Sequence, residues 1–137
     1  MTDGDLVAKK LALIETCVQE LRSLARPDEI EGDVRERRFV EHTLQLAIQA
    51  ALDAASHVVS SERLGEPRTN RELFDILARN DWLTPALGAK LRDMAGFRNV
   101  LVHGYTDVDP RIVREVAQHR LGDLLAFVSE IRARLRS

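Results

Sequence analysis

The feature that most constrains the fold is a long segment whose apolar residues face nearly every side of a helix. Between Leu44 and Val59 most positions are Leu, Ile, Val or Ala, which predicts a helix covered on most sides by the rest of the protein. No stretch of the sequence shows the alternating pattern of a β-strand. With 137 residues, 45% of them hydrophobic and only 4% aromatic, the chain is expected to form one all-α domain over residues 1–137.

Capping and helix-breaking residues divide the chain into about five expected helices. They cover approximately residues 5–25, 32–61, 69–80, 85–103 and 110–135. Thr69 and Glu72 have the spacing of a capping box, and Thr84 and Asp109 each precede a proline at a first helical position. Gly104 is expected to end the fourth helix in the left-handed conformation. Short connections between helices favour an antiparallel bundle.

Two of these helices carry apolar stripes that are expected to face the core. The stripe residues are Leu6, Leu13 or Ile14, Cys17, Leu21 and Leu24 in the first helix, and Ile112, Val116, Leu121, Leu124, Val128, Ile131 and Leu135 in the last.

Composition excludes several classes of protein. The single Cys17 cannot form an internal disulfide, which favours a buried thiol and a reducing, cytoplasmic compartment. No apolar run approaches the roughly 18 residues of a membrane span, and the N-terminus lacks the pattern of a signal peptide. The four histidines are spread out and no Gly-rich phosphate loop occurs, so we expect neither a metal site nor a cofactor.

An arginine interrupts the apolar stripe of the fourth expected helix. Leu87, Leu91, Met94 and Leu101 fall on one line of that helix, and Arg98 lies near its centre. A buried charge is costly unless it has a partner or a task. Two structural interpretations stay open: Arg98 pairs with an acid from another helix, or it extends to solvent at a subunit boundary.

A histidine and the only tyrosine follow at the end of the same helix. His103 lies roughly 140° round the helix from Arg98, and its terminal position favours the protonated imidazole. Tyr105 follows a glycine at the expected helix end. A tyrosine in such a position usually packs its ring against the protein and leaves its hydroxyl group in contact with solvent. Arg98 and His103 together suggest acid–base chemistry on an anion.

The second helix carries a continuous polar stripe. Its members are Arg35, Arg38, His42, Gln45, Gln49, Asp53 and Ser56. This stripe is either a solvated face or the wall of a polar cleft. In a cleft, Asp53 and Gln49 would orient partners while Arg35 and Arg38 attract an anion.

With these residues in view, the chain resembles the HEPN superfamily, specifically the HepT-like toxins of HEPN/minimal-nucleotidyltransferase toxin–antitoxin systems. The resemblance runs from about residue 35 to residue 131 and is densest over residues 94–105. The signature is an arginine, four residues, a histidine, one residue and a tyrosine, which correspond to Arg98, His103 and Tyr105. Asn99 also matches, as do the segments at residues 46–53 and 74–77.

The resemblance implies a metal-independent endoribonuclease that needs no cofactor and works as a homodimer. The motifs of two protomers would meet in a cleft, where Arg98 binds the scissile phosphate and His103 acts as general acid or base. Asn99 would orient His103 or the phosphate. A partner nucleotidyltransferase antitoxin would attach AMP to Tyr105, and the added charge would repel RNA.

The net charge of −2 is an imperfect match to an RNA-binding protein, so a local basic groove is expected around Arg35, Arg38, Arg92 and Arg98. Two other functions compete with the ribonuclease. One is a non-catalytic HEPN binding module that pairs with a nucleotidyltransferase. The other is a purely structural bundle, in which Arg98 and His103 matter for stability alone.

Overall fold

The computed structural model describes residues 2–104 and 108–136, and every regular element within them is a helix. The elements in chain order are α1 (Gly4–Leu24), the 3-10 helix η1 (Pro27–Glu29), α2 (Val34–Ser61), α3 (Asn70–Arg79), α4 (Pro85–His103), α5 (Pro110–His119) and α6 (Leu121–Arg136). The all-α prediction is confirmed. Over the described residues, no helix combines the length and the hydropathy that crossing a bilayer requires.

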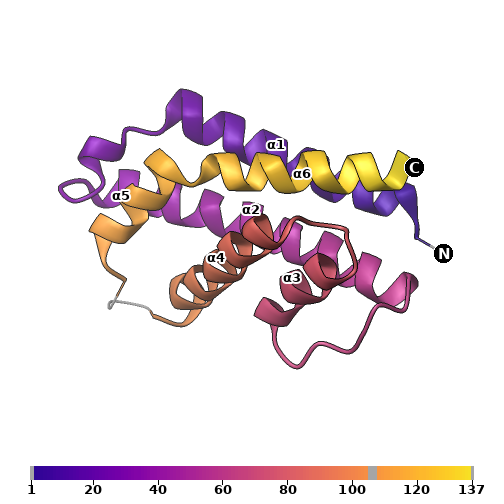
Figure 1. The fold of residues 1–137 in the computed structure, drawn as a ribbon. Coiled ribbons are helices and arrows are strands. Elements are labelled where there is room, and N and C mark those ends of the chain that lie inside the picture. The colour runs from indigo at the N-terminus through magenta and orange to yellow at the C-terminus, as the bar shows by residue number, and fades with distance from the viewer. Residues whose placement is uncertain (1, 105–107, 137) are drawn as a thin grey trace.

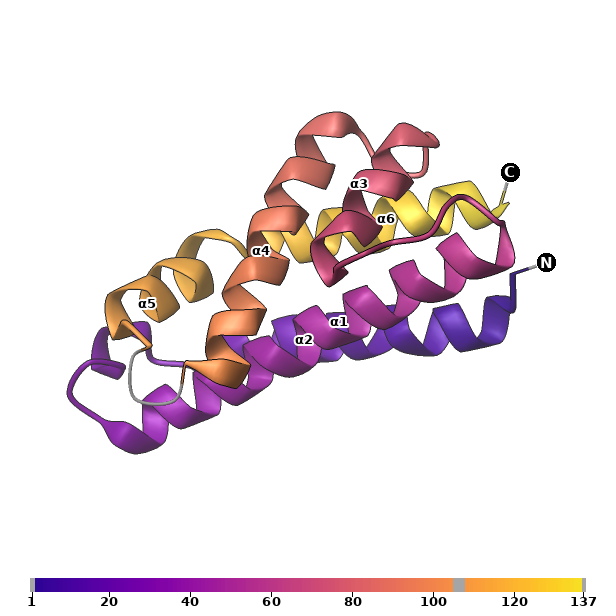
Figure 2. The ribbon, with the colours of Figure 1, turned by 90° about the horizontal axis from the view of Figure 1, so that it is seen from below.

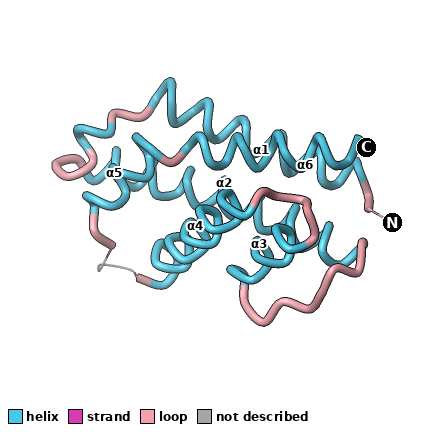
Figure 3. The backbone as a smooth tube through the Cα atoms, in the orientation of Figure 1, coloured by secondary structure: helices cyan, strands magenta, loops and turns pink. Residues whose placement is uncertain are grey.

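The long helices α1 and α2 lie side by side and antiparallel, and the remaining helices cover them (Figures 1 and 2). α6 runs back along α1, α4 crosses α2 obliquely, and α3 packs on α4. Short loops join most elements, and a longer one links α2 to α3 (Figure 3). The segment from Leu44 to Val59 supplies much of the core, as its apolar pattern predicts.

The predicted helix starts are confirmed by their capping bonds. Thr69 Oγ1 accepts from the Glu72 amide at 3.4 Å, and Thr84 Oγ1 accepts from the Leu87 amide at 3.3 Å. Asp109 Oδ1 accepts from the Arg111 amide at 2.9 Å. These bonds satisfy amides that a helix cannot pair internally, so a local sequence signal was sufficient to place each start.

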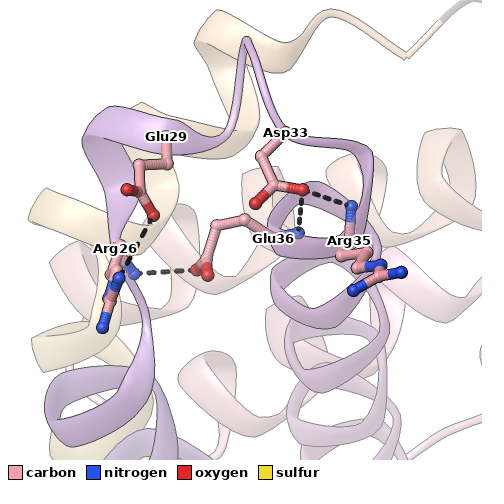
Figure 4. Close-up of polar contacts among 5 residues, drawn as sticks. All are labelled: Arg26, Glu29, Asp33, Arg35 and Glu36. Carbon is pink, nitrogen blue, oxygen red and sulfur yellow. Dashed lines mark hydrogen bonds and ion pairs between the residues drawn. The ribbon is translucent and has the colours of Figure 1, made fainter.

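A network of polar contacts holds the corner between α1 and α2 (Figure 4). Asp33 caps α2 by accepting from the Arg35 and Glu36 amides at 2.9 and 3.4 Å. The Arg26 amide donates to Glu36 Oε2 at 2.7 Å, which ties the end of α1 to the start of α2. The Arg35 side chain extends away from this network.

The fifth predicted helix is two helices, so the described residues form six α-helices rather than five. The chain bends at Arg120, whose backbone (φ −116°, ψ −1°) separates α5 from α6. The bend lets α5 pack on η1 and α2 while α6 runs along α1. Neither proline nor glycine occupies position 120, so tertiary packing places this break.

The predicted core stripes are correct in part. Cys17, Ile14 and Leu21 are buried in α1, whereas Leu6, Leu13 and Leu24 are exposed because the buried face of α1 is centred on Val7 and Leu11. In α5 the exposed residue is Ile112, and Val113 takes its place in the core.

The predicted left-handed conformation of Gly104 is wrong. Gly104 has φ −78° and ψ −18°, which any residue can adopt. A Cβ atom at this position would lie 2.5 Å from the Val100 carbonyl oxygen and 3.3 Å from Val108 Cγ2. The close approach of the chain, rather than a special backbone angle, therefore requires glycine here.

We expect Gly104→Ala to lower the free energy of unfolding by about 1–3 kcal/mol, because the added methyl group forces the end of α4 to shift. Thermal unfolding followed by circular dichroism measures the change. Gly122→Ala is the matched control, since a Cβ there meets nothing within 4 Å and alanine favours a helix. Equal stability of the two variants would contradict the steric explanation.

Candidate active site

Helix α4 carries the candidate residues at its C-terminal end. Its N-terminal half is anchored against α3, where a Cβ on Gly88 would lie only 2.9 Å from Ala78 Cβ. The buried residues of α4, a helix the structure describes throughout, all lie at or before Ala95. In the last two turns Phe97 and Leu101 still pack against the core, while Arg98 is half-buried and His103 is exposed.

Arg98 is half-buried, and it forms no ion pair with any carboxylate among residues 2–104 and 108–136. Its Nη1 donates to Asn99 Oδ1 at 3.3 Å. Its Nε is buried and lacks a partner within the described part of the chain. The interpretation of Arg98 as a core arginine neutralised by an acid of its own chain is therefore not what the structure shows.

His103 is the last residue of α4 and is exposed. Within the described ranges no hydrogen bond or ion pair connects it to Arg98. The two residues differ by roughly 140° in direction round the helix, so one protomer does not bring them together by direct contact. The position of His103 at the helix end is confirmed, and its side chain is open to a second molecule.

Gln49 and Asp53 belong to a polar chain between α1 and α2. Lys10 Nζ lies 3.1 Å from Asp53 Oδ2, and Gln49 Nε2 donates to Asp53 Oδ1 at 2.7 Å. This arrangement fixes the Gln49 amide and leaves its Oε1 buried without a partner among the described residues. These two predicted supporting residues contact each other, and no hydrogen bond in the described chain links them to Arg98, whereas the third, Asn99, accepts from Arg98.

A cavity of about 600 Å³ opens between the N-terminal half of α2, the end of α4 and the start of α5. Its polar wall consists of α2 side chains: Arg37, Arg38, Glu41, His42 and Gln45. Its apolar wall comes from Leu101, Val108 and Pro110. The cavity therefore has one charged and one hydrophobic side.

Glu41 is half-buried in the polar wall. Burial raises the pKa of its carboxyl group, and the neighbouring Arg37 and Arg38 guanidinium groups act in the opposite direction. The raised pKa means that desolvation of the carboxylate outweighs its attraction to the two arginines.

The predicted polar stripe of α2 does not form one continuous cleft. Arg38, His42 and Gln45 line the cavity. Asp53 pairs with Lys10 and accepts from Gln49, and Ser56 lines a separate hollow beside the loop that follows α2.

The predicted basic groove of four arginines is not formed either. Arg92 pairs with Asp75 on α3, and Arg35 is exposed outside the cavity. Of the four predicted arginines, only Arg38 lines the cavity, and the second arginine in the cavity wall is Arg37.

Residues 105–107 lie outside the described residues, and the predicted modification site Tyr105 is one of them. Among the described residues, no three His, Cys, Asp or Glu side chains are grouped so as to hold a metal ion.

The sequence interpretation missed three residues: Lys10, Arg37 and Glu41. Arg37 and Glu41 are four residues apart and therefore share one side of α2. That side borders the predicted polar stripe, and this proximity was the available signal. Nothing in the sequence pairs Lys10 with Asp53, because their contact depends on the alignment of two antiparallel helices.

Residues 14–131 match the family described as Ribonuclease HepT-like. The chain belongs to the HepT-like family. The mRNA nuclease HepT of Shewanella oneidensis is 32% identical over 131 residues, which cover 95% of this chain and 98% of that protein. The tRNA nuclease HepT of Aphanizomenon flos-aquae is 30% identical over 132 residues, covering 95% of this chain and 90% of that protein.

Solved structures agree with the HepT-like assignment. A tri-AMPylated HEPN toxin of S. oneidensis, solved in complex with an MNT antitoxin, superposes with a TM-score of 0.88 at 31% identity. The superposition covers 96% of this chain and 99% of the toxin. The six helices of the HepT-like chain therefore have the arrangement of a HEPN toxin.

Proposed function

We propose that this HepT-like chain is a metal-independent endoribonuclease toxin, neutralised by a nucleotidyltransferase antitoxin. Its relatives include an mRNA nuclease, a tRNA nuclease and a toxin in complex with an MNT antitoxin. One observation carries the catalytic part: Arg98 keeps a half-buried guanidinium without a carboxylate partner in the described chain, on the helix that ends in exposed His103.

Arg98 binds the scissile phosphate in this proposal. A guanidinium presents five N–H donors in a planar fork that matches the oxygens of a phosphate. Asn99 accepts from Nη1 and so orients the fork. The positive charge then stabilises the negative charge that builds on the phosphate oxygens during cleavage.

His103 moves the proton. Neutral imidazole removes the proton from the ribose 2′-hydroxyl, whose oxygen attacks the adjacent phosphorus. The bond from phosphorus to the 5′-oxygen breaks, and the leaving oxygen takes up a proton from water, while the imidazolium returns its own proton to the solvent. The products are a 2′,3′-cyclic phosphate and a 5′-hydroxyl. An imidazole suits this task because its ordinary pKa lies near neutral pH.

The separation of Arg98 and His103 round α4 supports a cleft between two protomers, because one protomer does not bring the two side chains together. Arg98 Nε and Gln49 Oε1 are buried without a partner in the described chain, which is costly. Both atoms are covered within the single chain, so the side chains around them must shift before a second protomer or RNA can reach them. Asp53, held by Lys10, fixes the Gln49 amide.

The antitoxin acts on Tyr105 in this proposal. The AMPylated state of the S. oneidensis toxin supports transfer of AMP to this residue, two positions after His103. Each added phosphodiester carries a negative charge, which repels the RNA backbone and blocks His103 and Arg98.

The purified chain is expected to cleave single-stranded RNA at the same rate with and without a chelator, and to leave cyclic phosphate ends. Gel analysis of end-labelled RNA in the presence of EDTA measures both. Cleavage that stops with EDTA and returns with a divalent cation would contradict metal independence. Intact binding of the nucleotidyltransferase without any RNA cleavage would assign the chain to a non-catalytic binding module.

A further inference from the structure

The cavity between α2, α4 and α5 has no role in the cleavage step described above. Its volume of about 600 Å³ falls within the range of small-molecule sites. Arginines lie on one side of it and aliphatic residues on the other. A ligand that fits both sides carries negative charge at one end and a flat or apolar group at the other.

The two arginines of the cavity are available to a ligand. Arg92, Arg114 and Arg132 each pair with a carboxylate. Arg37 and Arg38 form no ion pair within the described ranges, even though Glu41 lies in the same wall. Glu41 is the one carboxylate among the described residues of this wall; burial raises its pKa, and the Arg37 and Arg38 charges act in the opposite direction.

The cavity also adjoins the catalytic motif. Leu101 of its apolar wall comes three residues after Arg98 and two before His103, a rise of about 4.5 Å along the helix from Arg98. A polymer whose phosphate is held by Arg98 therefore has its neighbouring units within reach of the cavity.

We infer that this cavity is a substrate subsite that holds one nucleotide of the RNA next to the scissile phosphate. Arg37 and Arg38 bind its phosphate, and Leu101, Val108 and Pro110 contact its base. The inference rests on the proposed ribonuclease function and adds a binding site that takes no part in breaking the phosphodiester bond. It explains how a chain with a net charge of −2 retains RNA, because the positive charge is concentrated in one hollow.

The experiment measures RNA binding and cleavage separately. Fluorescence anisotropy with a labelled single-stranded RNA of about 20 nucleotides reports affinity in a His103→Ala background, over a range of salt concentrations. We expect Arg37→Gln/Arg38→Gln to weaken binding about 10- to 100-fold at low salt. Because each phosphate contact adds about 0.7 to the salt slope for single strands and the subsite holds one phosphate, the slope should fall by about 0.7. With His103 intact, the double substitution should raise KM far more than it changes kcat.

Two further variants make the test specific. Arg35→Gln removes one arginine charge from the same helix, but Arg35 lies outside the cavity, so its effect should stay within about twofold and below that of Arg37→Gln or Arg38→Gln alone. Glu41→Gln removes a competing carboxylate and should tighten binding several-fold.

Circular dichroism verifies that each variant is folded. Equal losses in Arg35→Gln and in the double variant would overturn the subsite in favour of general electrostatic attraction. Unchanged binding in the double variant, while the unsubstituted chain still cleaves RNA, would overturn the subsite and leave the ribonuclease proposal standing. Absence of cleavage by the unsubstituted chain would instead reject the proposed function.

Discussion

His103→Ala should lower the rate of RNA cleavage by about 10²–10⁴-fold, the usual contribution of a general acid or base, and should abolish growth arrest on expression. The side chain is exposed at the end of α4, so its removal should leave the fold and RNA binding nearly intact. Initial rates on end-labelled RNA and thermal unfolding measure the two effects. His119→Ala is the matched control, because His119 is likewise exposed and ends α5.

Arg98→Ala should lower the rate of RNA cleavage by about 10²–10³-fold, because the charge that develops on the phosphate is no longer stabilised. Arg98→Lys should restore little of the cleavage activity, because an ammonium group lacks the planar, two-pronged donor geometry of a guanidinium group. Full activity and full toxicity in both His103→Ala and Arg98→Ala would reject the assignment of the site.

The dimeric cleft is tested by mixing these two inactive variants. If one site takes Arg98 from one protomer and His103 from the other, an Arg98→Ala/His103→Ala heterodimer contains one complete site, and the mixture regains part of the activity. If both residues of a site come from the same protomer, the mixture stays inactive.

Tyr105→Phe should abolish AMP transfer completely and should make the chain resistant to its antitoxin. Tyr105 is the only tyrosine in the sequence, so no second phenol can replace it. Phenylalanine keeps the ring but removes the oxygen that attacks the α-phosphate of a nucleoside triphosphate and displaces pyrophosphate. Intact-mass measurement after co-expression with the nucleotidyltransferase gives the number of AMP groups.

Two results would separate the parts of this prediction. Added AMP on the Tyr105→Phe chain would place the modification at another residue. Loss of AMP with continued neutralisation would show that the antitoxin inhibits by binding, without transfer. RNA cleavage by the Tyr105→Phe chain alone serves as the control that the catalytic residues still work.

Local sequence signals were sufficient for the starts of three helices and for the positions of the two catalytic candidates on α4. The starts of α3, α4 and α5 depend on Thr69, Thr84 and Asp109, whose capping bonds reach only two or three residues along the chain. Arg98 and His103 are likewise placed by their own helix, so their separation round it follows from helical geometry alone.

Contacts between helices could not be predicted from the sequence. The break at Arg120 exists because α5 and α6 pack against different neighbours. Leu6 and Leu24 belong to a helical stripe, but the face of α1 that meets the bundle is rotated away from them. The need for glycine at position 104 comes from the approach of Val108 and the Val100 carbonyl group.

For the site, periodicity identified a polar side of α2. It did not predict that the polar residues on this side contact different neighbouring elements. Packing pairs Asp53 with Lys10 on α1 and places Arg38 in a cavity shared with Leu101 and Val108. Hydrogen bonds along one helix are set by residues a turn apart, whereas the crossing of two helices depends on every side chain between them. For that reason most helix positions and the motif could be predicted from the sequence alone. Which helices pack together, and the cavity between them, are determined only by the tertiary structure.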